Sequence, residues 1–440
     1  MKPSTRYTLI AVGFVVFLIL APLLVLYVSG RTINLDGKES SATGILDAKS
    51  NPTGAKLFID GKEHSSTPAI ARFLKQGEYQ FTLSKEGYFD WTKRLPIEAG
   101  KVTYAQEGVT EVQLLKKSEP KVLVPQGVSS FVIMNDVLWF VNGNRVVRAP
   151  FNNPADQTVI QLNFHPTILT ELRNRRHIYL GNNSILDTQT QALVKLTLPN
   201  TEYIAHPWDI AVSPNNVILF LGGDGNLYAH DPGAQKNRLI KEKVFAFTME
   251  DNTGYIIDDQ ARNHYEDSKS NISSAFWDGS NFQDYQIILS GAYGTQLYIT
   301  DNKELFCNCA GKLSRVGQSL EPLAQNADAL NVLLDLKTNE LSFITSGNEL
   351  MFYNFLRAKP QLLTRGGLTP QTAFLVRSSI GYGFIGTQSG LEAIEIDARD
   401  KPNRYQLLNG KQVWQIAITD NQKTIIALQD GALVSVDIRN

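Results

Sequence analysis

The chain has 440 residues, of which 43% are hydrophobic and 19% are charged, enough apolar residues for a large core. Its 42 basic and 43 acidic residues leave a net charge of −1, which excludes the electrostatic footprint of a nucleic-acid-binding protein. With two cysteines in the whole chain, the fold does not rest on a disulfide framework.

The N-terminus contains an uncharged run, Tyr7 to Val28, that is long enough to span a bilayer as a helix at about 1.5 Å per residue. Lys2 and Arg6 precede the run and favour an N-terminus inside the cell. We therefore expect residues 1–30 to form a cytoplasmic tail and a single-pass anchor in the cell membrane, with the bulk of the chain extracytoplasmic. The alternative is a cleaved signal peptide, since Val28-Ser29-Gly30 offers small residues at a cut site. The apolar run, however, exceeds a signal core of about 7–15 residues.

Residues 31–49 are polar and show no sustained periodicity, which predicts a spacer. Residues 50–117 follow a different pattern. An apolar run there turns back at Asp60-Gly61, and Thr67-Pro68 favours an extended connection, because the residue before proline avoids the helical region. This segment reads as a small β module.

Five short motifs in that module stand in a recognisable order: Pro52, Gly54-Ala55, Asp60-Gly61, Thr67-Pro68 and Gly87-Tyr88. They resemble the PEGA domain. Thr53 departs from that pattern, because the family has at this position the glutamate that gives it its name. The resemblance implies a small β-sandwich of the kind found in surface and cell-envelope proteins, and it implies no chemistry.

Short turn signals recur roughly every forty residues through residues 118–440, between runs rich in Val, Ile, Leu, Phe and Tyr. The eight signals are Asn142-Gly143-Asn144, Gly181-Asn182-Asn183, Asp224-Gly225-Asn226, Asp258-Asp259-Gln260, Asp301-Asn302-Lys303, Ser346-Gly347-Asn348, Gln388-Ser389-Gly390 and Gln429-Asp430-Gly431. Asn, Asp and Gly tolerate the positive φ of tight hairpins, and a repeat of four short strands at this period is typical of a β-propeller.

The fold class is therefore mainly β, with eight blades favoured and seven expected if one degenerate copy is an insertion. The last copy ends after three strands at Asn440. A propeller must pair its first and last edges, so we expect Lys121 to Val124 to supply the missing strand.

The chain lacks the common catalytic motifs: no Gly-x-Ser-x-Gly, no His-Glu-x-x-His and no phosphate-binding loop. We expect no catalytic residue, no cofactor and no metal site. Cys307 and Cys309 are interpreted as two small residues on one face of a strand, with a metal site or a short-loop disulfide as alternatives. The basic cluster Arg173-Asn174-Arg175-Arg176 is interpreted as a solvated turn.

Three residues are candidates for a recognition surface: His206, Trp208 and Trp277. Exposed tryptophan in propeller loops commonly contacts proteins or sugars. The opposing interpretation is that these side chains pack between blades.

The sequence thus predicts a non-enzymatic, membrane-anchored envelope protein that displays a propeller for binding a protein or a cell-wall glycan. One alternative is a propeller hydrolase or lyase acting on polysaccharide, which requires carboxylates that converge on one mouth of the central channel. Another is a structural spacer of a surface layer.

Overall fold

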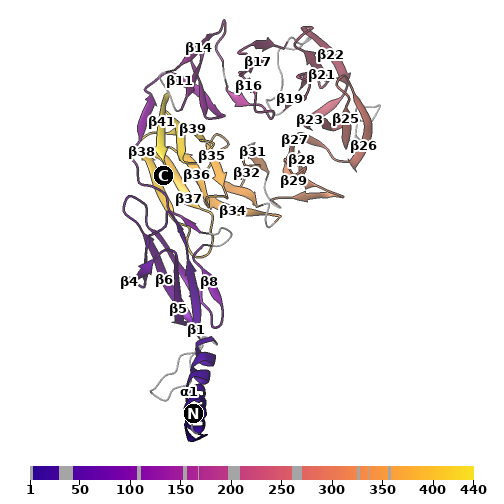
Figure 1. Ribbon diagram of the computed structural model, residues 1–440. Coiled ribbons are helices and arrows are strands. Elements are labelled where there is room, and N and C mark those ends of the chain that lie inside the picture. Colours follow the sequence, from indigo (N-terminus) through magenta and orange to yellow (C-terminus); the bar gives the residue numbers. More distant parts are fainter. Residues whose placement is uncertain are drawn as a thin grey trace.

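The computed structural model describes residues 3–28, 43–106, 111–151, 156–166, 168–196, 209–259, 270–324, 328–335, 337–354 and 358–440. Figure 1 shows three parts placed end to end: helix α1 (Pro3–Val28), a small β-sandwich and a large β-propeller. The described large apolar side chains of α1, from Val12 to Leu24, are 46–63% exposed.

No helix within the described residues is both long enough and apolar enough to cross a membrane.

The sandwich comprises two main sheets and one short strand pair. The strands are, in spatial order, β5 (Ala69–Lys75), β1 (Thr43–Ala48) and β8 (Val102–Tyr104) in the first sheet, and β4 (Lys62–Ser66), β3 (Lys56–Ile59), β6 (Gly77–Ser84) and β7 (Trp91–Ile97) in the second, while β2 (Ser50–Asn51) pairs with β9 (Val112–Gln113). Leu46, Phe81 and Trp91 are fully buried in the core between them.

The sandwich begins earlier in the chain than the sequence suggested. Residues 43–48 fall inside the expected spacer (31–49), yet β1 is the central strand of its sheet, with Leu46 and Ala48 fully buried. The strand has six residues and follows a polar stretch, so its alternation was too short to recognise.

The propeller consists of eight four-stranded sheets within the described residues, numbered here as blades 1 to 8 in ring order. Blade 1 is β11 (Val128–Met134), β12 (Val137–Asn142), β13 (Arg145–Pro150) and β14 (Thr158–Gln161); blade 2 is β15 (Thr170–Glu171), β16 (His177–Tyr179), β17 (Ser184–Asp187) and β18 (Leu193–Lys195); blade 3 is β19 (Ile210–Val212), β20 (Ile218–Leu221), β21 (Leu227–Asp231) and β22 (Lys236–Lys241); blade 4 is β23 (Val244–Glu250), β24 (Thr253–Asp259), β25 (Ser270–Trp277) and β26 (Phe282–Ser290). Blade 5 is β27 (Gly294–Ile299), β28 (Leu305–Cys309), β29 (Lys312–Val316) and β30 (Leu320–Pro322); blade 6 is β31 (Ala329–Asp335), β32 (Glu340–Thr345), β33 (Glu349–Asn354) and β34 (Lys359–Arg365); blade 7 is β35 (Phe374–Arg377), β36 (Tyr382–Thr387), β37 (Gly390–Glu395) and β38 (Arg404–Asn409); blade 8 is β39 (Val413–Ile418), β40 (Thr424–Gln429), β41 (Ala432–Asp437) and β10 (Lys121–Val124).

Blade 8 closes the ring by the expected strand exchange. Its spatial order is β10-β41-β40-β39, and Lys121 lies opposite Ser435 in an antiparallel pair. Throughout the described part of the ring, each blade shares an apolar core with the next, and these eight interblade cores hold the ring together.

Six of the eight turn signals lie between the second and third strands of a blade, as a regular repeat requires. The signal at Asp258 begins such a connection, whose following residues lie outside the described part. The signal at residues 301–303 joins the first two strands of blade 5 instead, and the equivalent turn of that blade is Ala310-Gly311, where both residues have positive φ.

The sandwich docks on blades 7 and 8 (Figure 1). A buried ion pair joins it to blade 7. Lys93 Nζ lies 3.1 Å from Glu395 Oε2, and neither side chain is exposed. Trp91 Nε1 donates to Glu395 Oε1 at 2.7 Å, and Lys93 Nζ also donates to the carbonyl oxygens of Asp397 (2.7 Å) and Arg399 (2.8 Å). Burial raises the pKa of Glu395, an effect that Lys93 opposes.

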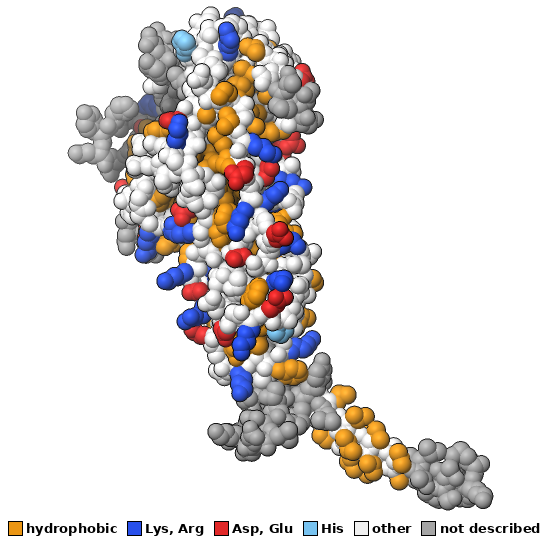
Figure 2. All heavy atoms as spheres, turned by 90° about the vertical axis from the view of Figure 1, so that its left-hand side faces the viewer, with side chains coloured by type: hydrophobic (Ala, Val, Ile, Leu, Met, Phe, Trp, Pro, Cys, Tyr) orange, Lys and Arg blue, Asp and Glu red, His pale blue; other side chains and the backbone are white. Residues whose placement is uncertain are grey.

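Apolar and backbone contacts extend this junction. Leu114 packs in the sandwich core, while the next residue, Leu115, packs in the core between blades 7 and 8. The rings of Phe89 and Tyr405 stack with centroids 4.9 Å apart. Arg399 donates to the carbonyl oxygens of Tyr104 and Ala105 at 3.0 and 3.1 Å. The sandwich and the propeller are therefore one continuous body, whose flank carries interspersed positive and negative side chains (Figure 2).

We expect Lys93→Met to destabilise the full-length protein by about 3–5 kcal/mol, because it leaves the buried Glu395 carboxylate without its ammonium partner. Unfolding by guanidinium chloride in detergent micelles measures this loss of unfolding free energy. The matched control is Lys101→Met, which removes an exposed pair with Glu98 and should change little. Equal effects of the two substitutions would contradict the role given to the junction.

Candidate functional site: the central channel

The innermost strands of blades 1, 2, 6, 7 and 8 line a cavity of about 280 Å³ in the central channel. Apolar side chains form most of its wall: Phe131, Ile133, Leu169, Leu333, Leu375 and Ile416. Charged residues stand where these strands end, with Glu171 closing β15, Asp335 closing β31 and Arg377 closing β35. Because the innermost strands run in the same direction around the axis, their ends gather at one opening, which we term the charged mouth.

Ion pairs link three consecutive blades at the charged mouth. Arg377 of blade 7, which is 1% exposed, lies 2.7 Å from Asp335 and 3.5 Å from Glu340 of blade 6. Lys337 lies 2.8 Å from Asp420 of blade 8. Burial opposes ionisation of Asp335, but the charge and hydrogen bonds of Arg377 outweigh it and lower the pKa of Asp335 below its usual range.

Blade 2 contributes a turn, residues 173–176, whose arginines cross the charged mouth; we call it the arginine turn. Arg173 pairs with Glu250 of blade 4, donates to the Ile299 carbonyl, and lies 3.1 Å from Asp301 of blade 5. Arg175 reaches toward Asp420 of blade 8, 3.8 Å away. The turn therefore ties blade 2 to three blades that are not its neighbours.

The interpretation of this cluster as a solvated turn was wrong. The Arg173 side chain is 18% exposed and has three partners from distant blades, and Arg176 pairs with Asp187 at 2.5 Å. Sequence reasoning missed it because those partners lie 77 to 128 residues further along the chain. A run of arginines at the end of an innermost strand was the one local signal.

Burial raises the pKa values of two acidic groups beside the innermost strands to about 7, and it also raises the pKa of Glu340. Burial raises the pKa of Glu171 to about 7 against the opposing effects of Lys337 and Arg175, whose Nε lies 3.4 Å away. Burial also raises the pKa of Asp209, which precedes β19 and is 3% exposed, to about 7. With pKa values of about 7, Glu171 and Asp209 are partly protonated near neutral pH.

Carboxylates do converge on one mouth, the arrangement that the polysaccharide-enzyme alternative requires. They are Glu171, Asp335, Glu340 and Asp420, and each lies within 4.0 Å of an arginine or lysine nitrogen. These carboxylates are therefore paired with basic side chains of the protein itself, and the pairs between different blades link those blades at the mouth.

Of the three residues expected to form a recognition surface, Trp277 is described, and it is buried. Trp277 is 1% exposed: it ends β25, its ring lies 5.0 Å from that of Phe282, and its Nε1 donates to Asn215 Oδ1 at 3.3 Å. A tight turn at Asp278–Asn281 gave the segment a loop-like composition while leaving Trp277 inside the core between blades 3 and 4. His206 and Trp208 lie outside the described residues.

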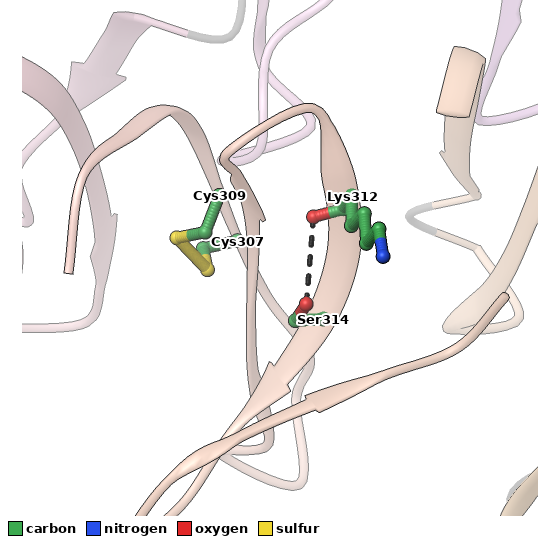
Figure 3. Close-up of a disulfide and its surroundings, with 4 residues drawn as sticks. All are labelled: Cys307, Cys309, Lys312 and Ser314. Carbon is green, nitrogen blue, oxygen red and sulfur yellow. Dashed lines mark hydrogen bonds between the residues drawn. A yellow bond between two sulfur atoms is a disulfide. The ribbon is translucent and has the colours of Figure 1, made fainter. Parts of the chain in front are cut away.

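Cys307 and Cys309 form a disulfide on β28, so of the three interpretations the short-loop disulfide is the one observed (Figure 3). Both residues are buried in the core between blades 4 and 5. Gly294 on the adjacent strand makes room for the bridge, since a Cβ at this position would lie 2.7 Å from Cys309 Sγ. A bridge between residues two apart closes a very small loop and restricts the unfolded chain little.

Comparison with known proteins identifies the sandwich: residues 43–111 match the family model described as the PEGA domain. Solved structures similar to the propeller include the C-terminal WD40 domain of Sif2 (11% identity, 75% of this chain and 99% of that chain, TM-score 0.49) and the Dos1 propeller (9%, 73% and 95%, 0.48). Virginiamycin B lyase from Staphylococcus aureus is similar at 12% identity over 72% of this chain and 99% of that chain, with a TM-score of 0.44. At this level the likeness concerns architecture, and nothing about ligand or activity carries over. A search among curated proteins found no match.

We expect Asp209→Asn to flatten the pH dependence of stability. A carboxyl whose pKa is raised in the folded state contributes stability that is fully present below its unfolded pKa and is lost as the pH rises through about 7. Between pH 5 and 9, the wild type should lose roughly 2–4 kcal/mol more than the variant, which is measured by chemical unfolding across that range. Replacing the exposed Asp156 by Asn should leave the pH dependence of stability as in the wild type. If Asp209→Asn showed the same slope of stability against pH as the wild type, the effect assigned to burial of Asp209 would be contradicted.

Proposed function

We propose that the protein is a non-enzymatic, membrane-anchored scaffold of the cell envelope, whose PEGA domain holds the propeller at a fixed position as a binding platform. The observation that carries the proposal is the junction built on Lys93 and Glu395, which joins the PEGA domain to the propeller rim without a flexible linker. A propeller held near a membrane gains from a raised effective concentration of membrane-bound partners.

Two features support an extracytoplasmic, anchored location. The run from Tyr7 to Val28 is uncharged, and the described large apolar side chains of α1 are largely exposed, as side chains facing lipid would be. The disulfide between Cys307 and Cys309 fits an oxidising compartment.

The PEGA domain adds a third supporting feature on the sheet β5-β1-β8, which lies toward α1 (Figure 1). Two large apolar side chains beside the first half of β1, the half nearer α1, are exposed: Phe73 by 39% and Val102 by 45%. Such side chains suit the apolar-to-polar boundary of a membrane surface.

A polysaccharide-active enzyme is the second candidate, and one observation favours it. Glu171, with its pKa raised to about 7, has the protonation behaviour of a general acid, and it borders the channel cavity. It ranks second because Arg175 pairs with this carboxylate and Arg173 crosses the same mouth.

For the anchored topology, protease added to intact cells (to spheroplasts where an outer membrane is present) should remove the propeller. An antibody against residues near Asn440 detects the loss, while a cytoplasmic marker stays intact. Protection of the propeller until lysis would place it in the cytoplasm and contradict the proposal.

For the absence of catalysis, we expect the full-length protein to release no reducing ends from purified wall or surface polysaccharides. Glu171→Gln and the exposed control Glu321→Gln should both match the wild type in a time-course of reducing-end release. Release by the wild type that Glu171→Gln abolishes and Glu321→Gln retains would make the second candidate correct.

A further inference from the structure

The channel mouth opposite the charged mouth lies where the turns between second and third strands gather; we call this side the turn face. Segments that lead into the innermost strands hydrogen-bond to these turns. Val128 N donates to Gly431 O at 2.9 Å, and Val244 N donates to Gly225 O at 2.7 Å. The first residues of the innermost strands therefore border this face.

In five blades the innermost strand carries a β-bulge at the same place, one residue after it begins. The residues skipped by the ladder are Ser129, Phe245, Thr295, Leu330 and Trp414. A bulge takes a residue out of the alternating pattern and re-aims its side chain. Three of the five are large and apolar.

Those three side chains are exposed on the turn face: Phe245 by 36%, Leu330 by 47% and Trp414 by 52%. Tyr293, just before β27, is 52% exposed, and its ring meets that of Phe245 edge to face at 5.5 Å. The four residues belong to blades 4, 5, 6 and 8 and form what we call the apolar arc.

The fold does not require apolar residues at these positions. Ser129 and Thr295 occupy equivalent bulges in blades 1 and 5, so the bulge accepts a small polar side chain equally well. An apolar side chain that stays half-exposed contributes little to the core. Clustering of such side chains on one face is typical of an interaction surface.

We propose that the apolar arc is the docking surface for an uncharged, apolar segment of a protein partner. The inference rests on the proposed function and names the class of ligand that the platform binds. Trp414 and Tyr293 would suit a sugar as well as a protein, but Leu330 and Phe245, in the same arc, carry no group that hydrogen-bonds a sugar hydroxyl, and this favours protein over glycan.

The charges around the arc support a neutral partner. Lys411 lies 3.2 Å from Asp430, and Arg365 lies 2.7 Å from Glu349, so these rim charges neutralise one another. An apolar centre within a polar rim is the usual anatomy of a protein–protein interface.

The strands that carry the arc continue into the channel. Leu333 lies three residues after Leu330 on β31, and Ile416 lies two residues after Trp414 on β39; both line the 280 Å³ cavity, together with the polar Gln415. A side chain of the bound segment that entered the mouth would meet mostly apolar walls.

The test places the photo-reactive residue p-benzoylphenylalanine at positions 245, 330 and 414 of the full-length protein in its native cells. Val159 (53% exposed) and Leu239 (48%), on the outer strands β14 and β22, are replaced in the same way as matched controls. We expect one protein, the same from all three arc positions, to be crosslinked there and not at the controls.

Affinity provides a second readout that does not depend on crosslinking chemistry. With the crosslinked protein purified, Trp414→Ser should weaken binding by at least about tenfold, and Leu239→Ser should leave it unchanged. Both variants alter exposed side chains, so their thermal unfolding should match that of the wild type.

Three results would overturn the inference. Adducts that carry glycan and no protein would exclude a protein ligand, and equal adducts at arc and control positions would exclude the arc as the site. Absence of arc adducts, while the full-length chain still retains a specific envelope component, would reject the arc and leave the scaffold function standing. If the full-length chain retains no envelope component at all, the proposed function fails with it.

Discussion

The ion pair between Lys93 and Glu395 fixes the position of the PEGA domain relative to the propeller. Both side chains are fully buried, so each charge depends on the other, on the Trp91 N–H and on carbonyl oxygens of the loop after β37. A buried charge without its partner is costly, which makes separation of the two units unfavourable. The PEGA domain is therefore a rigid arm of the propeller.

This rigid arm gives the propeller a defined orientation relative to the PEGA domain. The junction lies at the rim, on blades 7 and 8, so both openings of the channel stay clear of the PEGA domain (Figure 1). One opening is bordered by charged side chains: the arginine turn of blade 2 forms ion pairs with residues of blades 4, 5 and 8. The other is bordered by exposed apolar side chains. The two mouths thus differ in chemistry, and this difference is the basis for proposing the turn face as the recognition surface.

Much of the architecture could be predicted from local sequence. Hairpin turns at positions such as Asp224-Gly225 depend on backbone conformations that few residues tolerate, and four short strands per repeat set the blade. The need for Lys121 to Val124 to close blade 8 followed from counting strands, because an unpaired sheet edge is unfavourable. Blade 5 shows the limit: its turn signal was found at Asp301, one strand too early, and the number of blades was unaffected.

The candidate sites depended on contacts that no local pattern encodes. Arg173 meets partners 77 and 128 residues away, and Lys93 meets Glu395 across some three hundred residues, so both pairs arise only when the ring is closed. Trp277 shows the same limit in reverse, since a tight turn and a neighbouring blade bury a side chain that its own segment presents as exposed. The sequence by itself determined the elements, their repeat and the closing strand, because short-range backbone preferences and strand pairing dictate them. Tertiary structure alone decided which charges meet, which aromatic side chains are buried and which bulged residues face solvent, because these depend on packing between blades far apart in the chain.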